Sequence, residues 1–249
     1  MSKTSCSKNK CLITGGAGFI GYHLSDKLLR EGYSVLSVDN LSDYYDPEIK
    51  KARLLDIESK IDKSDYKSTN FEFKCMDLMD RDLVFDLVRK FNPDVICHLA
   101  AQAGVRYSLE NPYTYVENNT VVTINLLEAS KKFEIKDFVF ASTSSVYGLS
   151  TDMPFNEETS IDSIISPYAT TKRSCELLCH TYNHIYGINF RILRFFTVYG
   201  PWGRPDMALF KFTKSILNGE PIEIYNNGKM KRDFTYVSDI VDGFCAAIE

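Results

Sequence analysis

The chain has 249 residues, of which 44% are hydrophobic and 25% are charged, and its formal net charge is −4. This composition is typical of a globular protein with a sizeable core, and the interspersed charges leave no basic stripe of the kind that binds nucleic acid. The polar start, residues 1–10, offers no signal peptide, and no later segment is long and apolar enough to span a membrane.

Cysteine usage indicates the cellular compartment. The seven cysteines are an odd number, and several lie in apolar, strand-like runs instead of at the spacing of a disulfide framework. We therefore expect reduced thiols and a cytoplasmic protein. The residues concerned are Cys6, Cys11, Cys75, Cys97, Cys175, Cys179 and Cys245.

Short apolar runs alternate with longer amphipathic runs along the chain. The apolar runs predict strands at 11–13, 35–38, 70–74, 95–99, 138–141 and 189–195. The amphipathic runs predict helices at 19–30, 47–60, 81–91, 112–132, 166–186, 208–217 and 238–249. Near-continuous apolar strands separated by helices are typical of an α/β fold with a doubly wound parallel sheet, a Rossmann-type domain.

Three segments interrupt this alternation. Residues 39–45 are polar and aromatic and form an insertion after the second strand. Residues 148–167 are rich in Ser, Thr, Asp and Glu and predict a loop over the edge of the sheet, whereas 197–205 is dense in turn residues. Loops in such places often carry substrate contacts.

A glycine-rich segment follows the first predicted strand and opens the first predicted helix. Gly15, Gly18 and Gly21 are spaced three apart, and Gly16 also allows the pattern Gly-x-Gly-x-x-Gly. Glycine at these places permits a tight turn and a close approach of the backbone to a pyrophosphate. Because Asp39 follows at the end of the second strand, near the expected separation, the context predicts a dinucleotide site.

Asp39 also bears on which dinucleotide binds. Its carboxylate would accept hydrogen bonds from the adenosine ribose and would repel a 2′-phosphate, which favours NAD over NADP. The alternative is a strand-ending aspartate that caps a turn. Asp77, after the third strand, is a further candidate for contact with adenine, but its position alone does not decide the matter.

Tyr168 and Lys172 stand four residues apart on a predicted helix and therefore share one face. A nearby ammonium and the positive charge of an oxidised nicotinamide would lower the pKa of the phenol and make Tyr168 a general base. A solvated Tyr-x-x-x-Lys pair is the alternative for this pattern taken alone. The pair gains weight because the hydroxyl-rich segment 142–145 ends a preceding strand, where ligands bind in such sheets.

Two other patterns are weaker. Cys175, Cys179, His180 and His184 have helical spacings that could suit a metal, but no second cluster accompanies them, which favours helix packing and surface positions. The Tyr44–Tyr45 pair could stack on a base, and we assign it to the insertion instead.

With these motifs in this order, the chain resembles the extended short-chain dehydrogenase/reductase family of NAD-dependent epimerases and dehydratases. Segments 39–47, 98–108 and 194–205 look most like those of the UDP-glucuronate 4-epimerases. The resemblance covers nearly the whole chain. It implies NAD as the cofactor and conversion of UDP-glucuronate to UDP-galacturonate through a 4-keto intermediate, often in the service of polysaccharide biosynthesis.

The resemblance also implies roles for individual residues. Thr143, Tyr168 and Lys172 match the catalytic trio. The positions that match NAD contacts are Gly15, Gly18, Phe19, Ile20, Gly21, Asp39, Asn40, Asp77, Leu78, Leu99, Ala100, Ala101, Tyr168 and Lys172. The positions that match substrate contacts are Arg106, Ser144, Ser145, Thr197, Arg204 and Arg232.

Alternatives within and beyond the family remain open. Related dehydratases and decarboxylases carry carboxylates after the position of Thr143, where this chain has Ser144 and Ser145, and glucose-type 4-epimerases have Asn at the position of Thr197. These differences favour glucuronate epimerisation over a decarboxylase or a 4-epimerase of neutral sugars. A non-catalytic NAD-binding fragment is the alternative from another class.

The resemblance predicts the organisation of the chain. We expect a mainly NAD-binding Rossmann domain over 1–188 and a mixed segment over 189–249 that contributes to a smaller UDP-sugar domain. Family members continue beyond the position of Glu249, so we expect that the C-terminal part of the substrate domain is absent. Homodimerisation through the helices at 112–132 and 166–186 is a further expectation.

Overall fold

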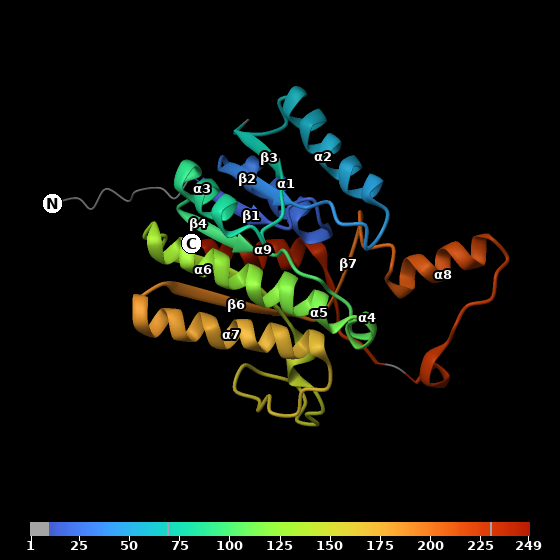
Figure 1. Cartoon of the computed structure of the whole chain (residues 1–249). Helices are drawn as coiled ribbons and strands as arrows, with labels where there is room; N and C mark the ends of the chain where they lie inside the picture. Colours follow the sequence, from blue (N-terminus) through green and yellow to red (C-terminus); the bar gives the residue numbers. More distant parts are fainter. Residues whose placement is uncertain (1–9, 69, 230) are drawn as a thin grey trace.

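A six-stranded parallel sheet forms the centre of the protein in the computed structural model, which describes residues 10–68, 70–229 and 231–249 (Figure 1). The strand order is β3-β2-β1-β4-β5-β6, the classic order of a dinucleotide-binding fold. The predicted fold class is therefore confirmed. The strands are β1 (Lys10–Thr14), β2 (Ser34–Asp39), β3 (Phe71–Cys75), β4 (Val95–His98), β5 (Asp137–Thr143) and β6 (Asn189–Phe195).

The central strands are buried on both faces. Leu12 and Ile13 of β1 pair with Ile96 and Cys97 of β4, and all four side chains are fully buried. A parallel sheet covered by helices on both sides requires this uninterrupted apolar run. The strand order reverses between β1 and β4, so the carboxyl ends of these two strands border the crevice where such sheets bind ligands.

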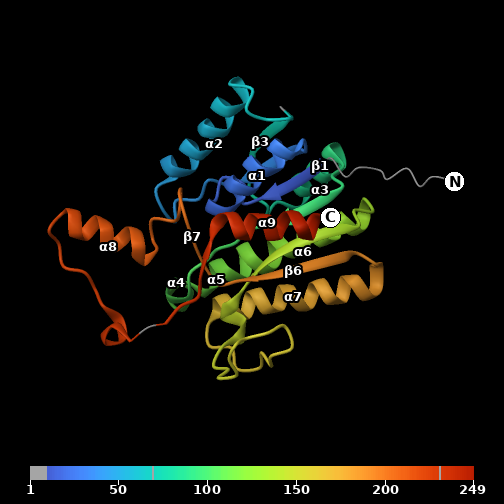
Figure 2. The ribbon, with the colours of Figure 1, turned by 180° about the vertical axis from the view of Figure 1, so that it is seen from behind.

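Helices cover the two faces of the sheet. On one face α1 (Phe19–Glu31) and α9 (Val237–Ile248) pack side by side, with α2 (Pro47–Asp62) against α1 (Figure 2). On the other face lie α3 (Arg81–Phe91), α6 (Val122–Lys132) and α7 (Pro167–Tyr186). The core is thus two apolar layers, one on each side of the strands.

Local sequence signals explain where α7 begins and ends. The Ser166 hydroxyl accepts a hydrogen bond from the Ala169 amide at 3.2 Å, Pro167 occupies the first turn, and Gly187 closes the helix in the left-handed conformation. These are the preferred cap residues of a helix. They set the position of α7, which carries Tyr168 and Lys172.

The predicted helix at 112–132 is not one regular α-helix. The structure has α5 (Pro112–Tyr115), a π-helix η1 (Val116–Val121) and then α6, and an additional short helix, α4 (Val105–Glu110), precedes them. In η1 the Asn119 side chain bonds to Gln102 and Thr171 in neighbouring segments. Periodicity predicts that this stretch is helical, but the local widening depends on those tertiary contacts.

Residues 196–236 leave the sheet and form an outer segment. Here β7 (Thr197–Tyr199) and β8 (Phe234–Tyr236) pair in parallel, and between them lie α8 (Ala208–Leu217) and the 3-10 turn η3 (Tyr225–Gly228). No residue of α8 is buried, and the helix projects from the rest of the protein in Figures 1 and 2. The start of the region 197–205, predicted to be rich in turns, is therefore a strand. The sequence did not indicate this strand because its pairing partner, β8, is distant along the chain.

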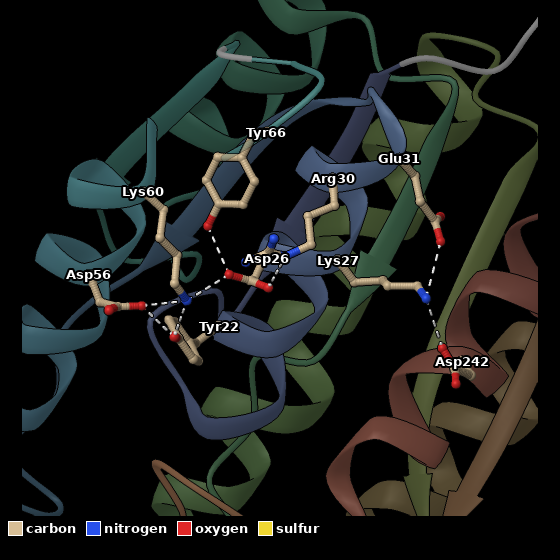
Figure 3. A network of polar contacts seen from close by, with 9 residues as sticks. All are labelled: Tyr22, Asp26, Lys27, Arg30, Glu31, Asp56, Lys60, Tyr66 and Asp242. Carbon is tan, nitrogen blue, oxygen red and sulfur yellow. Dashed lines mark hydrogen bonds and ion pairs between the residues drawn. The ribbon is translucent and has the colours of Figure 1, made fainter. Parts of the chain in front are cut away.

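A polar network fixes α1 to its neighbours (Figure 3). Asp26 of α1 accepts hydrogen bonds from Lys60 of α2 and from the Tyr66 hydroxyl, each at 2.8 Å. On the other side, Lys27 forms an ion pair with Asp242 of α9 at 3.2 Å. Partly buried networks of this kind hold geometry better than isolated surface pairs. The partly buried contacts of Asp26 therefore hold α2 against α1. The Lys27–Asp242 pair is largely exposed and adds little, so α9 is held on α1 mainly by apolar packing.

The cysteines of the described chain, Cys11, Cys75, Cys97, Cys175, Cys179 and Cys245, are all free thiols. Cys6 lies outside the described residues. Within the described residues, no helix combines the length and apolar character that crossing a membrane requires.

Candidate active site

One large cavity of roughly 1590 Å³ opens at the carboxyl edge of the sheet. Every residue predicted to contact NAD lines it, as do Thr143, Ser144, Ser145, Thr197, Arg204 and Arg232. The exception is Arg106, whose guanidinium lies 3.6 Å from the centre of the Tyr225 ring in η3 and does not line the cavity. The fold thus brings the predicted cofactor and substrate residues into one space.

The glycine-rich turn lies between β1 and α1 at the bottom of this cavity. A Cβ atom on Gly15 would lie 2.7 Å from the Ala100 amide nitrogen, and one on Gly21 would lie 2.3 Å from the Gly15 carbonyl oxygen. Both positions therefore require glycine. The first turn of α1 holds no acidic residue, so its free amides and helix dipole favour an anion such as a pyrophosphate.

Asp39, at the end of β2, faces the cavity and is held from two sides. One of its carboxylate oxygens accepts a hydrogen bond from the Leu41 amide at 2.8 Å and from the Lys50 ammonium at 3.2 Å. Asp39 therefore caps its own turn and also lines the cavity. The two roles considered for it from the sequence are compatible with each other. Sequence reasoning missed Lys50, whose charge offsets that of Asp39 and weakens the electrostatic argument against a 2′-phosphate.

Tyr168 and Lys172 project from α7 into the same cavity. The Tyr168 ring packs edge-on against Tyr115, with ring centres 5.9 Å apart. Lys172 is almost completely buried, and its ammonium lies 4.3 Å from the centre of the Phe140 ring. A solvated surface pair is therefore excluded for these two residues.

Burial controls the ionisation of this pair. Burial raises the pKa of Tyr168, while hydrogen bonding to the Thr143 hydroxyl and the charge of Arg204 act in the opposite direction. Burial lowers the pKa of Lys172 to about 8. In the polypeptide alone, desolvation outweighs both opposing contributions. The lower pKa of Tyr168 that is expected beside an oxidised nicotinamide stays a prediction.

The strand-end hydroxyls are positioned by a buried ion pair. Thr143 ends β5, and its hydroxyl accepts a hydrogen bond from the Ser145 amide at 3.1 Å, which starts the 3-10 turn η2 (Ser144–Tyr147). The neighbouring Ser142 donates a hydrogen bond to Glu176 of α7. Glu176 is fully buried and pairs with Arg194 of β6 at 2.9 Å. These contacts lock the end of β5 against α7.

A chain of hydrogen bonds, which sequence reasoning missed, begins behind the glycine-rich turn. The Ala100 amide donates to the Thr14 hydroxyl at 3.2 Å, and that hydroxyl lies 2.7 Å from Nδ1 of His98. On the other side of the ring, Nε2 lies 3.0 Å from the Thr123 hydroxyl, which itself donates to the Asn119 carbonyl. This pattern assigns the proton of His98 to Nε2. Burial lowers the pKa of His98 well below its usual value, so the ring is neutral.

The same chain continues to the catalytic helix. The Asn119 side chain donates to the Thr171 hydroxyl at 3.0 Å, and Thr171 donates to the Tyr168 carbonyl at 2.9 Å. The π-helix η1 places Asn119 at this junction. Hydrogen bonds therefore connect the segment beside the dinucleotide turn with the backbone of Tyr168. The only sequence signal for Asn119 was its polar side chain within the predicted helix at 112–132.

The two arginines of the outer segment differ in their surroundings. Arg204 forms two hydrogen bonds with Asp206, one of them at 3.0 Å, and it faces the cavity beside Tyr44. Arg232 is exposed and donates to the carbonyl of the adjacent Lys231. Arg204 is therefore held in place by the carboxylate of Asp206. Arg232 borders the cavity, and the hydrogen bond of its guanidinium goes to the neighbouring residue.

The four residues of the candidate metal pattern on α7 divide between the core and the surface. Cys175 and Cys179 are buried in the core, whereas His180 and His184 are exposed. Across residues 10–68, 70–229 and 231–249, no group of three or more His, Cys, Asp or Glu side chains could hold a metal ion. The Tyr44–Tyr45 pair lies in the insertion, with Tyr44 packed against Tyr107.

A phenol and a buried ammonium that share a cavity with a dinucleotide turn fit one class of protein, the NAD-dependent short-chain dehydrogenases and reductases. Comparison with known proteins narrows this class. The model of the NAD dependent epimerase/dehydratase family matches residues 11–249, and the chain belongs to that family. NAD is the cofactor of this family of enzymes.

Three relatives illustrate the similarity. The chain is 49% identical over 240 residues to the protein CapI of Staphylococcus aureus, covering 96% of this chain and 69% of that protein. It is 45% identical to a UDP-glucuronate 4-epimerase of Thermodesulfobacterium geofontis, covering 96% and 71%. The crystal structure of the UDP-glucuronic acid 4-epimerase of Bacillus cereus with UDP-glucuronic acid and NAD superposes with a TM-score of 0.86 at 39% identity, covering 96% and 73%.

Proposed function

We propose that the chain catalyses the NAD-dependent 4-epimerisation of UDP-glucuronate to UDP-galacturonate. The observation that carries the proposal is the position of Tyr168: it faces the cavity of the glycine-rich turn, which Thr143 at the end of β5 and the buried Lys172 also line. The sequence similarity to UDP-glucuronate 4-epimerases supports the choice of substrate.

The residues of the chain divide the chemical work. Tyr168 takes the proton from the sugar 4-hydroxyl, and the Thr143 hydroxyl orients that phenol. Lys172 supplies a positive charge close to the phenol and is held over the Phe140 ring. NAD, when bound at the glycine-rich turn, would supply a reversible hydride acceptor for carbon 4 of the sugar. The remaining binding residues hold UDP while the sugar turns.

A proposal follows for the sugar carboxylate. A 4-keto uronate is a β-keto acid and loses carbon dioxide readily, so an epimerase must hold the carboxylate in place. Ser144, Ser145 and Thr197 line the cavity and offer hydroxyl or amide donors to a carboxylate. We expect Thr197→Ala to lower turnover and to raise a UDP-pentose by-product. Unchanged turnover and unchanged by-product would remove Thr197 from this role.

The test of the activity is direct. The purified chain is incubated with UDP-glucuronate and NAD, and the sugar signals are followed by proton NMR, with Tyr168→Phe as the control. UDP-galacturonate without a pentose would establish the epimerase. A UDP-pentose would indicate a decarboxylase, turnover of UDP-glucose instead would indicate a neutral-sugar epimerase, and NAD binding without any product would indicate a non-catalytic module.

Domain division and oligomeric state are part of the same proposal. We assign 1–188 mainly to NAD binding and 189–249 to a mixed segment, in which β6 and α9 join the main sheet layers and the outer segment borders the substrate side. Exposed apolar side chains on α5 and α7, Tyr113 and Leu177 among them, suit a homodimer. Light scattering of the purified chain tests that assignment.

A further inference from the structure

Arg53 is a fully buried arginine in α2 that contacts three segments distant from one another in sequence. One terminal nitrogen, Nη1, donates to the Ala17 carbonyl of the glycine-rich turn at 2.9 Å and to the Tyr45 hydroxyl of the insertion at 2.8 Å. The other, Nη2, donates to the Trp202 carbonyl of the outer segment at 2.7 Å. A single guanidinium therefore joins the dinucleotide turn to the substrate side.

The charge of Arg53 has no carboxylate partner among the described residues. Other part-buried arginines are paired, Arg194 with Glu176 and Arg204 with Asp206, whereas no ion pair involves Arg53. Its Nε atom is also buried without a hydrogen-bond partner. A buried cation whose hydrogen-bond partners are all neutral keeps a cost of desolvation that an anion would offset. Directly behind the amides of the glycine-rich turn, this cation fits a diphosphate bound in that turn.

The Trp202 turn depends on the same contact. Trp202 has a left-handed backbone conformation, with φ of 60°, which is unfavourable for a residue with a side chain. Three contacts hold it: the Arg53 bond, a bond between Nε2 of His23 and the Pro201 carbonyl at 2.9 Å, and the packing of the Trp202 ring on Tyr22. Arg204, two residues later, faces the cavity.

We propose that Arg53 is a positioning residue that couples the two sides of the site, so that a diphosphate bound at the glycine-rich turn stabilises the turn that carries Trp202 and Arg204. The coupling rests on the NAD site of the proposed function. Arg53 itself does not line the cavity, so it acts through the backbone of the turns that it holds. Binding of the dinucleotide then prepares the substrate side before a sugar nucleotide arrives.

A built-in probe makes the coupling measurable. Trp202 is the only tryptophan of the chain, so tryptophan fluorescence reports on this turn alone. Protein stripped of nucleotide is titrated with ADP-ribose, which carries the diphosphate but no nicotinamide, and both affinity and Trp202 emission are recorded. The variants are Arg53→Met, Arg53→Lys and, as a matched control, Lys51→Met, which removes a cation from the exposed side of α2, where its ammonium pairs with Glu48.

In the wild type and in Lys51→Met, we expect the emission of Trp202 to change on saturation with ADP-ribose. Arg53→Met should weaken ADP-ribose binding on the order of tenfold, through loss of a nearby charge, and should abolish the emission change. Arg53→Lys keeps the charge, so affinity should stay within about threefold. Its emission change should nevertheless be reduced, because one ammonium cannot bridge both carbonyls.

The proposal is overturned if Arg53→Met shows the full emission change at saturation, or if Lys51→Met loses it to the same extent as Arg53→Met. It is also overturned if the wild type binds ADP-ribose without any change of emission. None of these measurements uses a sugar nucleotide. A chain that responds as expected but does not epimerise UDP-glucuronate would therefore contradict the proposed function and leave the coupling intact.

Discussion

The sheet layers and the outer segment use similar residues in opposite ways. The strands β1 and β4 place leucine and isoleucine at full burial between two layers of helices. In α8, Leu209, Ile216 and Leu217 have the same apolar character on a regular amphipathic helix, yet none of its residues is buried. A hydrophobic pattern thus predicts the kind of element, whereas burial depends on a second surface that faces it.

The difference extends to the site. Residues proposed for dinucleotide binding and catalysis lie on the sheet layers and are fixed by buried hydrogen bonds, as Tyr168 is through Thr171. On the substrate side, Thr197 lies on the short strand β7 and Arg204 in the turn region that follows it, both outside the six-stranded sheet. We infer that chemistry depends on the sheet layers and that substrate choice depends on the outer segment.

The sharpest test of this division replaces Tyr168 with Phe. Loss of the general base should lower kcat by about 10³-fold, while the phenyl ring keeps its packing against Tyr115 and NAD still binds. Turnover is measured by NMR and NAD content by calorimetry. Thr197→Ala in the outer segment should change turnover much less. Equal losses in both variants would contradict the division.

Core truncation separates the two regions by stability. Phe138→Ala, at a fully buried position of β5, should lower the free energy of unfolding by about 3–5 kcal/mol through the cavity that it leaves. Leu217→Ala in α8, where the side chain is 81% exposed, should change it by less than about 0.5 kcal/mol. Urea denaturation measures both. A large loss in the α8 variant would show that this helix has a buried face in solution.

Two glycines sharpen the comparison within the sheet layers. Gly21→Ala should destabilise the protein by about 1–3 kcal/mol, because the added Cβ would lie 2.3 Å from the Gly15 carbonyl oxygen. Gly243→Ala in α9 meets nothing within 4 Å and should stabilise the protein by about 0.5–1 kcal/mol. Thermal unfolding of the two variants measures both changes in stability. A Gly21→Ala variant as stable as the wild type would be incompatible with the close turn described above.

Lys172 gives the comparison a pH dependence. Its pKa of about 8 in the folded protein lies below the usual value of 10.5, so the folded state releases its proton first as the pH rises. Activity should fall above pH 8, whereas stability should rise between about pH 8 and 10.5, because the unfolded state then binds more protons. Lys172→Met should remove the rise in stability. If stability still rose over this pH range in Lys172→Met, the rise would come from another titratable group.

Many features of the site follow from local sequence. The strands, the glycine-rich turn, Asp39 and the Tyr168–Lys172 pair are short-range patterns that the structure reproduces. Lys50 and His98 could not be predicted in the same way, because their roles arise from contacts with residues on other strands and helices. Burial, which no local pattern shows, also raises the pKa of Tyr168 in the polypeptide.

The sequence by itself determined most of the elements, their order and the family, because periodicity, cap residues and motif spacing are properties of neighbouring residues. Only the tertiary structure decided which side chains support the site. It buried Arg53 between three segments, widened one helix at Asn119 and left α8 without a covering surface. Each of these depends on the energy of contacts between residues far apart in the chain, which no local pattern encodes.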